Sequence, residues 1–314
     1  MIFVIYALVA AAVTMLSIKA ADYVELIDKK TSLSGAFIGG IMLSAVTSLH
    51  ELFTSLSSTL LLDEPGLCIG NILGSDLFNL AVLAVLIVVF NRSFAVADIA
   101  HGHQNVLWLL LIAYTAVALN MLGVLSMELF TVSITSIVLF ACYAASIKYL
   151  SGEDKEDDGE EDTNPMTLKQ ILVRFALVAV GIVVLSVLIS QVTDMLAEEL
   201  NLGKSLAGAL FMGVATSLPE LSSTIALFRK KCFDIAVGNI VGSNIFNLII
   251  LSVSDVLYTG TGLYDCSDSK TVALLAFGFL AHPLILCALK LLHRWVLVGL
   301  YVGTVARYVG FLTI

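Results

Sequence analysis

The chain has 314 residues, of which 59% are hydrophobic and only 13% are charged, and its formal net charge is −9. Soluble globular proteins are about 45–50% apolar and about a quarter charged. This composition therefore excludes a soluble enzyme, a nucleic-acid-binding protein and a disordered regulator. A membrane-spanning helix needs about 20 apolar residues, so the length allows about ten spans joined by short loops.

Apolar runs along the chain predict ten membrane spans. The approximate ranges are 2–26, 34–62, 66–90, 105–122 and 126–150 in the first half, and 168–196, 206–228, 234–257, 271–289 and 294–314 in the second half. We therefore expect an all-α membrane protein with ten transmembrane helices.

The positions of Lys and Arg predict the orientation in the membrane. With the N-terminus outside, thirteen of the sixteen basic residues fall on the inside, and Lys204, Lys270 and Arg307 fall on the outside. Inside loops carry the excess of Lys and Arg in membrane proteins, so both termini are expected to face outward. Because no long soluble domain interrupts the spans, we expect a multi-pass protein of a prokaryotic plasma membrane.

An acidic segment separates the two halves of the chain. Residues 152–163 hold eight carboxylates and one Lys. Such runs are usually disordered and solvated, so we interpret residues 151–166 as a cytoplasmic linker between a first unit, 1–150, and a second unit, 167–314. The alternative is a loose site that gathers divalent cations, but the segment has no EF-hand-type loop to support it.

A pair of motifs occurs twice. The first copy reads TSLHE at 47–51 and GNILGSDLFNL at 70–80, and the second reads TSLPE at 216–220 and GNIVGSNIFNL at 238–248. Each half contains five predicted spans, an odd number, so the halves should lie in the membrane with opposite orientation. We therefore expect two inverted five-helix repeats, the plan of secondary transporters that bind their substrate between the repeats.

Glu51 and Glu220 occupy matching places in the two repeats. A carboxylate in mid-membrane costs at least about 2.5–3.5 kcal/mol on insertion scales. The second, third, seventh and eighth predicted spans contain no Lys or Arg near their middle. A bound cation is then the simplest counter-charge, and the alternative is a structural carboxylate paired with a basic residue from elsewhere.

Hydroxyl and amide side chains accompany both glutamates, and several are four residues apart, on one helix face. Hard oxygen donors suit Ca²⁺ and, by the same reasoning, Na⁺, but they do not suit zinc or copper. The candidate ligands are Thr47, Ser48, Glu51, Ser75 and Asn79 in the first half, and Thr216, Ser217, Glu220, Ser243 and Asn247 in the second half.

Pro219 predicts irregular backbone beside Glu220. Proline has no N–H, so the carbonyl four residues earlier loses its helical partner. Irregular backbone at membrane depth persists where it lines a cavity, and carbonyls from Gly213 to Ala215 are therefore candidate ligands.

His50 stands in the first half where Pro219 stands in the second. A break in this span must then come from Gly39, Gly40 or Ser44. His50 itself is either a polar residue in the place of the proline or a proton-sensitive neighbour of Glu51.

Two other features of the repeats have a packing interpretation. Gly70 and Gly74, like Gly238 and Gly242, form the small-x-x-x-small pattern of membrane helix contacts. Asp76 has no acidic counterpart, because Asn244 matches it. We expect Asp76 to make a polar contact between helices, and the alternative is a third charge in the site.

The sequence TSLPE followed by GNIVGSNIFN resembles the alpha-repeat signature of sodium/calcium exchangers, in the calcium:cation antiporter superfamily. The resemblance implies a core of eight helices that holds the ions, with the first and sixth spans sliding across it. By position it implies ion ligands at Thr47, Ser48, Glu51, Ser75, Asn79, Thr216, Ser217, Glu220 and Ser243, and backbone carbonyls as ligands at Ser44 and Gly213.

The chain departs from the family pattern in two places. Members often have Pro-Glu in both repeats, whereas this chain has His50-Glu51 in the first. Many members, including potassium-dependent ones, carry Asp where this chain has Asn247. The missing carboxylate argues against potassium dependence and leaves the ion stoichiometry open.

The predicted function is antiport of Na⁺ for Ca²⁺ by alternating access, with Ca²⁺ extruded as Na⁺ flows inward. One Ca²⁺, or a few Na⁺, would neutralise both glutamates, and occupancy would be mutually exclusive. The alternatives are a proton/calcium antiporter on the same scaffold, which His50 favours, a cation channel, and a membrane-embedded protease, for which no H-E-x-x-H is present. We expect no enzyme activity, no cofactor besides the transported ions, and a chain that can work as a monomer.

Overall fold

The computed structural model describes most of the chain. The described residues are 2–61, 63, 65–129, 132–152, 164–199, 216–259, 262–265, 269–290, 299, 302, 303 and 306. Three parts of the chain lie outside them: most of the acidic linker, the first part of the seventh predicted span including Gly213, and most of the tenth predicted span.

Helices dominate the described part of both halves. The first half contains α1 (Ile2–Lys30), α2 (Gly35–Phe37), the π-helix η1 (Ile38–Leu43), α3 (Ser44–Thr47), α4 (Leu49–Leu60), α5 (Pro65–Val89), α6 (Asn91–Phe94), α7 (His101–Met121), β1 (Glu128–Leu129), β2 (Val132–Ser133) and α8 (Ile134–Ser151). The second half contains α9 (Leu168–Glu199), α11 (Leu218–Lys230), α12 (Phe233–Leu257), the short 3₁₀ helix η2 (Leu263–Asp265) and α13 (Ser269–Lys290).

Within the described residues, seven helices are long and apolar enough to cross a membrane, and a bent pair, Gly35–Thr47 with Leu49–Leu60, is an eighth candidate. These eight correspond to predicted spans one to six, eight and nine. The described part of the seventh predicted span is α11, which has 13 residues. The all-helical membrane architecture is therefore confirmed, and the count of ten stays a prediction.

The fifth predicted span begins later than expected. The sequence predicted a helix from residue 126, but α8 begins at Ile134. Gly123, with a φ of 72°, turns the chain after α7, and the next residues form the antiparallel pair β1–β2. Ser133 then caps α8, because its Oγ accepts a hydrogen bond from the Thr135 N–H at 3.2 Å.

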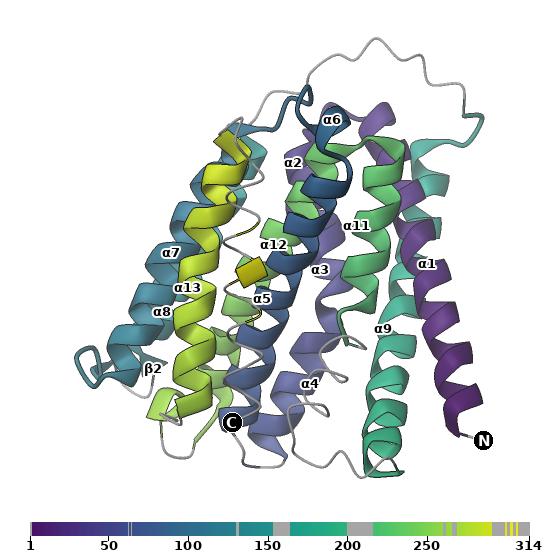
Figure 1. Ribbon diagram of the computed structural model, residues 1–314. Helices are drawn as coiled ribbons and strands as arrows, with labels where there is room; N and C mark the ends of the chain where they lie inside the picture. The colour runs from purple at the N-terminus through teal and green to yellow at the C-terminus, as the bar shows by residue number, and fades with distance from the viewer. Residues whose placement is uncertain are drawn as a thin grey trace.

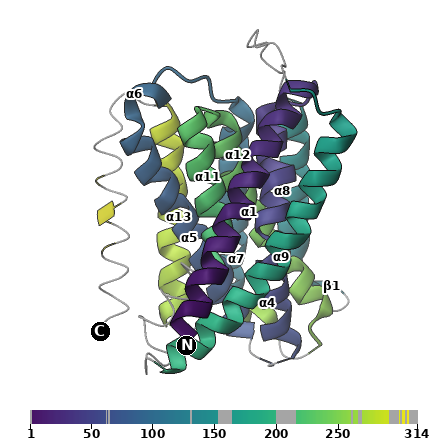
Figure 2. The same cartoon turned by 90° about the vertical axis from the view of Figure 1, so that its right-hand side faces the viewer.

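α1 and α9 lie side by side at one edge of the molecule, and they run in opposite directions (Figures 1 and 2). The end of α1 lies beside the start of α9, since Lys30 Nζ donates to Asn164 O at 3.1 Å. Only 17% of the apolar window of α1 and 22% of that of α9 are buried, against 72% for α12. The two helices thus form a lipid-facing layer on a core that includes α12.

Glycine allows η1 to approach α12 without intervening side chains. A Cβ added at Gly39 would overlap the Ile235 carbonyl, and one added at Gly242 would overlap the Gly40 carbonyl. The predicted packing role is therefore confirmed for this part of the second motif. No described atom lies within 4 Å of a Cβ built at Gly70 or Gly74.

Candidate ion-binding site

The two candidate glutamates each lie in the first turn of a helix that starts after a break. The breaks fall at Ser48, with φ −94° and ψ 5°, and at Ser217, with φ −89° and ψ 13°. Glu51 follows in α4 and Glu220 in α11. Helix N-termini carry a positive partial charge that stabilises carboxylates, so both breaks favour acidic side chains at this depth.

The break in the first half is not at the residues predicted for it. Gly39 and Gly40 lie in the π-helical turn η1 and Ser44 begins α3, whereas the bend of 44° falls at Ser48. A histidine side chain contributes to this break, because His50 Nδ1 lies 3.1 Å from the Thr47 carbonyl oxygen. That carbonyl can only accept, so Nδ1 carries a proton and donates it.

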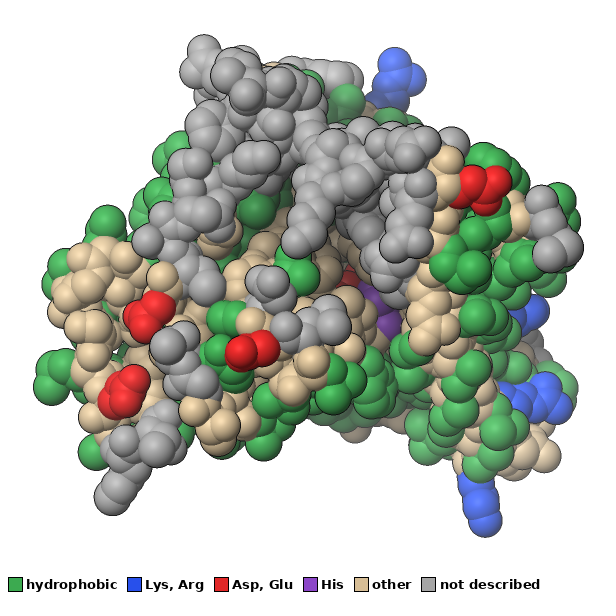
Figure 3. All heavy atoms as spheres, turned by 90° about the horizontal axis from the view of Figure 1, so that it is seen from below, with side chains coloured by type: hydrophobic (Ala, Val, Ile, Leu, Met, Phe, Trp, Pro, Cys, Tyr) green, Lys and Arg blue, Asp and Glu red, His purple; other side chains and the backbone are tan. Residues whose placement is uncertain are grey.

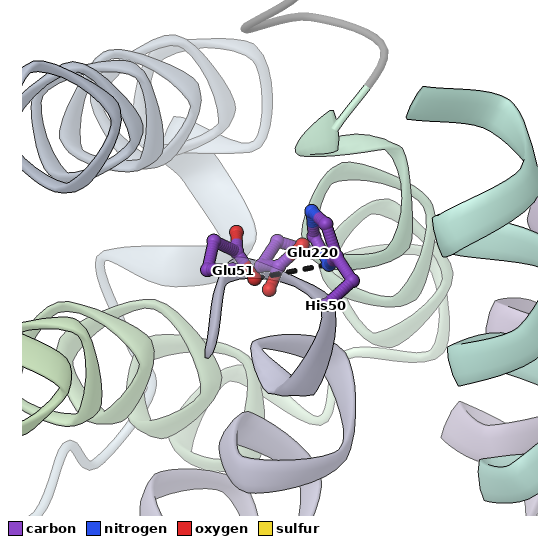
Figure 4. Close-up of side chains that lie close together, drawn as sticks. All are labelled: His50, Glu51 and Glu220. Carbon is purple, nitrogen blue, oxygen red and sulfur yellow. Dashed lines mark ion pairs between the residues drawn. The ribbon is translucent and has the colours of Figure 1, made fainter. Parts of the chain in front are cut away.

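Figure 4 shows that the two glutamates converge from different halves of the chain, next to His50. One ligand atom from each of these three residues lies within 4.8 Å of the other two, and all three residues are buried. Among the described residues, no Lys or Arg lies at ion-pair distance from either carboxylate. The two acidic side chains therefore meet as predicted, without a Lys or Arg partner in the described part of the chain, and His50 is the one basic side chain beside them.

His50 lies against Glu51 rather than merely next to it in sequence. Its Nδ1 is 3.0 Å from Glu51 Oε2, although its N–H is directed at the Thr47 carbonyl. Its Nε2 is buried and has no hydrogen-bond partner among the described residues. His50 is thus a direct neighbour of Glu51 in the cluster. This contact was part of one of the two alternatives that the sequence left open.

Hydroxyl groups link the two halves around the carboxylates. Ser48 Oγ donates to Glu220 Oε1 at 3.0 Å. Thr47 Oγ1 lies 3.5 Å from Ser243 Oγ and 3.5 Å from Asn239 Oδ1. Candidate ligands from positions almost 200 residues apart are therefore in direct contact.

The eleven candidate ligands in the described residues are all buried, and Gly213 lies outside these residues. Ser44 is oriented by local contacts: its Oγ donates to Gly40 O at 2.7 Å, and its carbonyl accepts from Ser48 N at 2.9 Å and from Thr47 Oγ1 at 3.2 Å. The buried candidates are Ser44, Thr47, Ser48, Glu51, Ser75, Asn79, Thr216, Ser217, Glu220, Ser243 and Asn247.

Several oxygens of this set are buried without a hydrogen-bond partner in the described part of the chain. Buried polar atoms are paired in the large majority of cases, so their concentration here requires an explanation. The atoms are Glu51 Oε1 and Oε2, Glu220 Oε2, Ser75 Oγ, Asn79 Oδ1, Ser217 Oγ and Asn247 Oδ1. Together they form a set of hard donors suited to a cation such as Ca²⁺ or Na⁺.

Asp76 makes the helix contact that the sequence favoured. Its carboxylate accepts from Asn247 Nδ2 at 3.1 Å and from Tyr114 OH at 3.0 Å. Two further buried residues were not predicted as part of the site: Tyr114, which contacts Asp76, and Asn239, which lies beside the candidate ligand Thr47. The repeat contained a signal for Asn239, because Asn71 occupies the equivalent place in the first half.

The face seen from below in Figure 3 carries acidic side chains among hydrophobic and uncharged ones, and the Lys and Arg side chains in view lie at its rim. A histidine and an acidic side chain are visible deep in a hollow near its middle. This face is therefore hollowed toward the interior of the molecule.

A family profile matches nearly the whole chain: the family described as sodium/calcium exchanger protein matches residues 1–150 and 170–314. The chain belongs to this sodium/calcium exchanger family. Its members are transporters rather than enzymes, and the chain is accordingly a multi-pass membrane protein.

Individual relatives agree with this assignment. The inner membrane protein YrbG of Escherichia coli is 29% identical over 226 residues, which are 68% of this chain and 66% of that protein. The sodium/calcium exchanger MaX1 of Methanosarcina acetivorans is 41% identical over 63 residues, 20% of this chain and 18% of that protein. The long match thus spans about two thirds of its curated relative.

The fold is shared with a solved exchanger. A structure of the sodium-calcium exchanger NCX_Mj, soaked with Na⁺ and Sr²⁺, superposes with a TM-score of 0.73 at 22% identity and covers 98% of this chain and 99% of that one. At this identity the likeness concerns the fold.

Proposed function

We propose that this family member is a secondary antiporter that exchanges Na⁺ for Ca²⁺ by alternating access. The observation that carries the proposal is the buried pair Glu51 and Glu220, which meet without Lys or Arg among the described residues. The unpartnered hydroxyl and amide oxygens around them complete a donor set for hard cations. We propose the twelve candidate residues of the sequence analysis as ligands, Gly213 among them.

Charge explains why such a site would exchange ions rather than leak them. Two bare carboxylates in a water-poor interior are costly, and one Ca²⁺ neutralises both. A few Na⁺ do the same through the same oxygens, so the two kinds of occupancy exclude each other. The loaded site then crosses the hydrophobic barrier more easily than the empty one, which couples the two fluxes.

Helix directions support two inverted repeats. α5 and α12 are equivalent spans of the two halves, and they run in opposite directions, as do α1 and α9 (Figure 1). The start of α5 lies beside the end of α12, with Cys68 Sγ 3.6 Å from Ser254 Oγ. At the other end, after α5, Phe94 in α6 packs on Phe233 with ring centroids 5.4 Å apart.

Basic residues support an orientation with both termini outside. Lys29 and Lys30 end α1, Lys148 lies in the last turn of α8, and Arg229 and Lys230 end α11. Inside surfaces carry the excess of Lys and Arg. We therefore assign this end of the molecule to the cytoplasm, and Ca²⁺ extrusion follows if Na⁺ enters down its gradient.

A proton/calcium antiporter is the second candidate, and His50 is the observation that favours it. Its Nδ1 lies 3.0 Å from Glu51 Oε2, inside the proposed site. Histidine is the side chain that most often changes charge near neutral pH, so a proton could take the place of Na⁺ as the coupling ion.

Purified protein in sealed vesicles tests both candidates. We expect uptake of ⁴⁵Ca²⁺ that depends on an outward Na⁺ gradient and is insensitive to K⁺. Uptake driven by a pH gradient without Na⁺ would select the proton antiporter, and Ca²⁺ flux without any counter-ion would indicate a channel. Glu220→Gln should abolish the Na⁺-driven uptake, and an unchanged rate in this variant would refute the assignment.

A further inference from the structure

Two side chains outside the candidate ligand set hold two candidate ligands in fixed orientations. Asp76 on α5 contacts Asn247 on α12, and Asn244 on α12 contacts Asn79 on α5. Asp76 and Asn244 occupy the same place in the two copies of the repeated motif, and so do Asn79 and Asn247. The contacts are therefore reciprocal: each motif orients the amide of the other.

Hydrogen-bond chemistry determines which way each amide points. The Asp76 main-chain carbonyl can only accept, so the Asn244 atom 3.1 Å away from it is Nδ2. The other terminal atom of Asn244 is then Oδ1, which can only accept a hydrogen bond. The Asn79 atom 3.1 Å away from it is therefore the donor, Nδ2. This chain of contacts leaves Asn79 Oδ1 as the free end of its amide.

Asn247 is oriented by the carboxylate in the same way. Asp76 Oδ1 accepts from Asn247 Nδ2 at 3.1 Å, while Asp76 Oδ2 accepts from Tyr114 OH at 3.0 Å. Asn247 Oδ1 is thereby the free end of the second amide. Both free oxygens are buried and lack a hydrogen-bond partner in the described residues.

We infer that Asp76 and Asn244 are positioning residues for the transported cation. By binding the N–H₂ end of each amide, they present the carbonyl oxygens of Asn79 and Asn247 to the ion. Without them, either amide could rotate and direct its Nδ2 donors at a cation, which is repulsive. The inference rests on the proposed function, since it concerns ligands of the proposed site, and it requires only the acceptor oxygen of Asp76.

Substitutions that keep or remove this acceptor test the inference. Asp76→Leu keeps the branched shape but has no acceptor, and we expect the Ca²⁺ KM to rise about 10–100-fold, as for other residues that orient metal ligands. Asp76→Asn can still accept from Asn247 through Oδ1 while its Nδ2 donates to the Tyr114 hydroxyl. Its KM should therefore rise far less. Tyr114→Phe is the matched control, because it removes a hydrogen bond to Asp76 but leaves the contact with Asn247.

A double-mutant cycle separates positioning from general stability. If Asp76 acts through the Asn247 amide, then Asp76→Leu should add little to the KM of Asn247→Ala. If the double variant instead raised the KM by the product of the two single effects, the inference would be overturned. An unchanged KM in Asp76→Leu would also overturn it. If that variant does not fold, an Asp76→Asn protein as impaired as Asn247→Ala would overturn it too. Wild-type vesicles without Na⁺-driven uptake would instead refute the proposed function.

Discussion

Replacing Glu220 with Gln should stabilise the ion-free protein while removing most of its stabilisation by Ca²⁺. Glu51 and Glu220 each offer an oxygen within 4.8 Å of the other. Two unit charges at this distance repel each other by about 3.5 kcal/mol at an effective dielectric constant of about 20. Proton uptake by either carboxylate already relieves part of that repulsion in the wild-type protein. Glu220→Gln should therefore raise the free energy of unfolding of the ion-free protein, but by less than the full repulsion.

The same substitution weakens the binding of Ca²⁺. Wild-type protein at a Ca²⁺ concentration of about 100 times Kd gains about 2.7 kcal/mol of stability by mass action. Glutamine has nearly the same shape and can still accept the hydrogen bond from Ser48, but it removes one of the two charges that attract the ion. We expect this gain to fall by at least about 1.4 kcal/mol, which corresponds to a tenfold weaker Kd.

Thermal unfolding of the detergent-solubilised protein, followed by the helical circular dichroism signal with EDTA and with Ca²⁺, measures both effects. Glu128→Gln is the control, because Glu128 is an exposed carboxylate in β1. It should change neither the ion-free midpoint nor the Ca²⁺ shift. A Glu220→Gln protein with a lower ion-free midpoint and an undiminished Ca²⁺ shift would refute the reasoning.

Three further outcomes are expected. Gly242→Ala should lower the free energy of unfolding by about 1–3 kcal/mol, because the added methyl group overpacks against η1. Gly74→Ala is the control, because a Cβ there meets no described atom within 4 Å. Equal melting points for the two variants would contradict this prediction. Lys230→Gln loses two partly exposed ion pairs, with Asp22 and with Glu25, both at 2.6 Å. The free energy of unfolding should fall by at most about 1 kcal/mol for each pair, and by less in high salt; a larger loss that does not depend on salt would argue against this. Burial, followed by the Glu25 charge, raises the pKa of the Cys232 thiol to about 12. Little of this thiol is then thiolate at pH 8, so maleimide should label Cys232 more slowly in the folded protein than in the unfolded chain. Comparable labelling rates would contradict this prediction.

Long apolar runs with clear ends were predicted well from the sequence. The third predicted span, 66–90, is found as α5, Pro65–Val89, because a proline starts the run and a turn at Phe90 follows it. The start of the fifth span was wrong, since Glu128–Leu129 and Val132–Ser133 pair as antiparallel strands before α8 begins at Ile134. Which structure such a stretch adopts depends on tertiary contacts, among them the Ser133 N–H bond to Asp255 at 2.9 Å.

The residue types of the site could be predicted, but their contacts could not. The repeated motif located Glu51 and Glu220, because an intramembrane carboxylate is costly enough to mark a functional position. The hydrogen bond between Ser48 and Glu220 depends on how two broken helices from different halves meet. The orientation of His50 depends on a main-chain carbonyl at the break, and residue spacing carries no information about it.

The length of α1 determines where its charged end lies. Its 29 residues extend about 44 Å, while the hydrocarbon layer of a bilayer is about 30 Å thick. The apolar stretch that ends before Lys19 fills most of this layer, so the remaining turns reach into the headgroup zone. Asp22 and Glu25 meet Lys230 there. The ion pairs that join α1 to α11 therefore lie beyond the apolar stretch of α1, at the end of the helix that carries its charged residues.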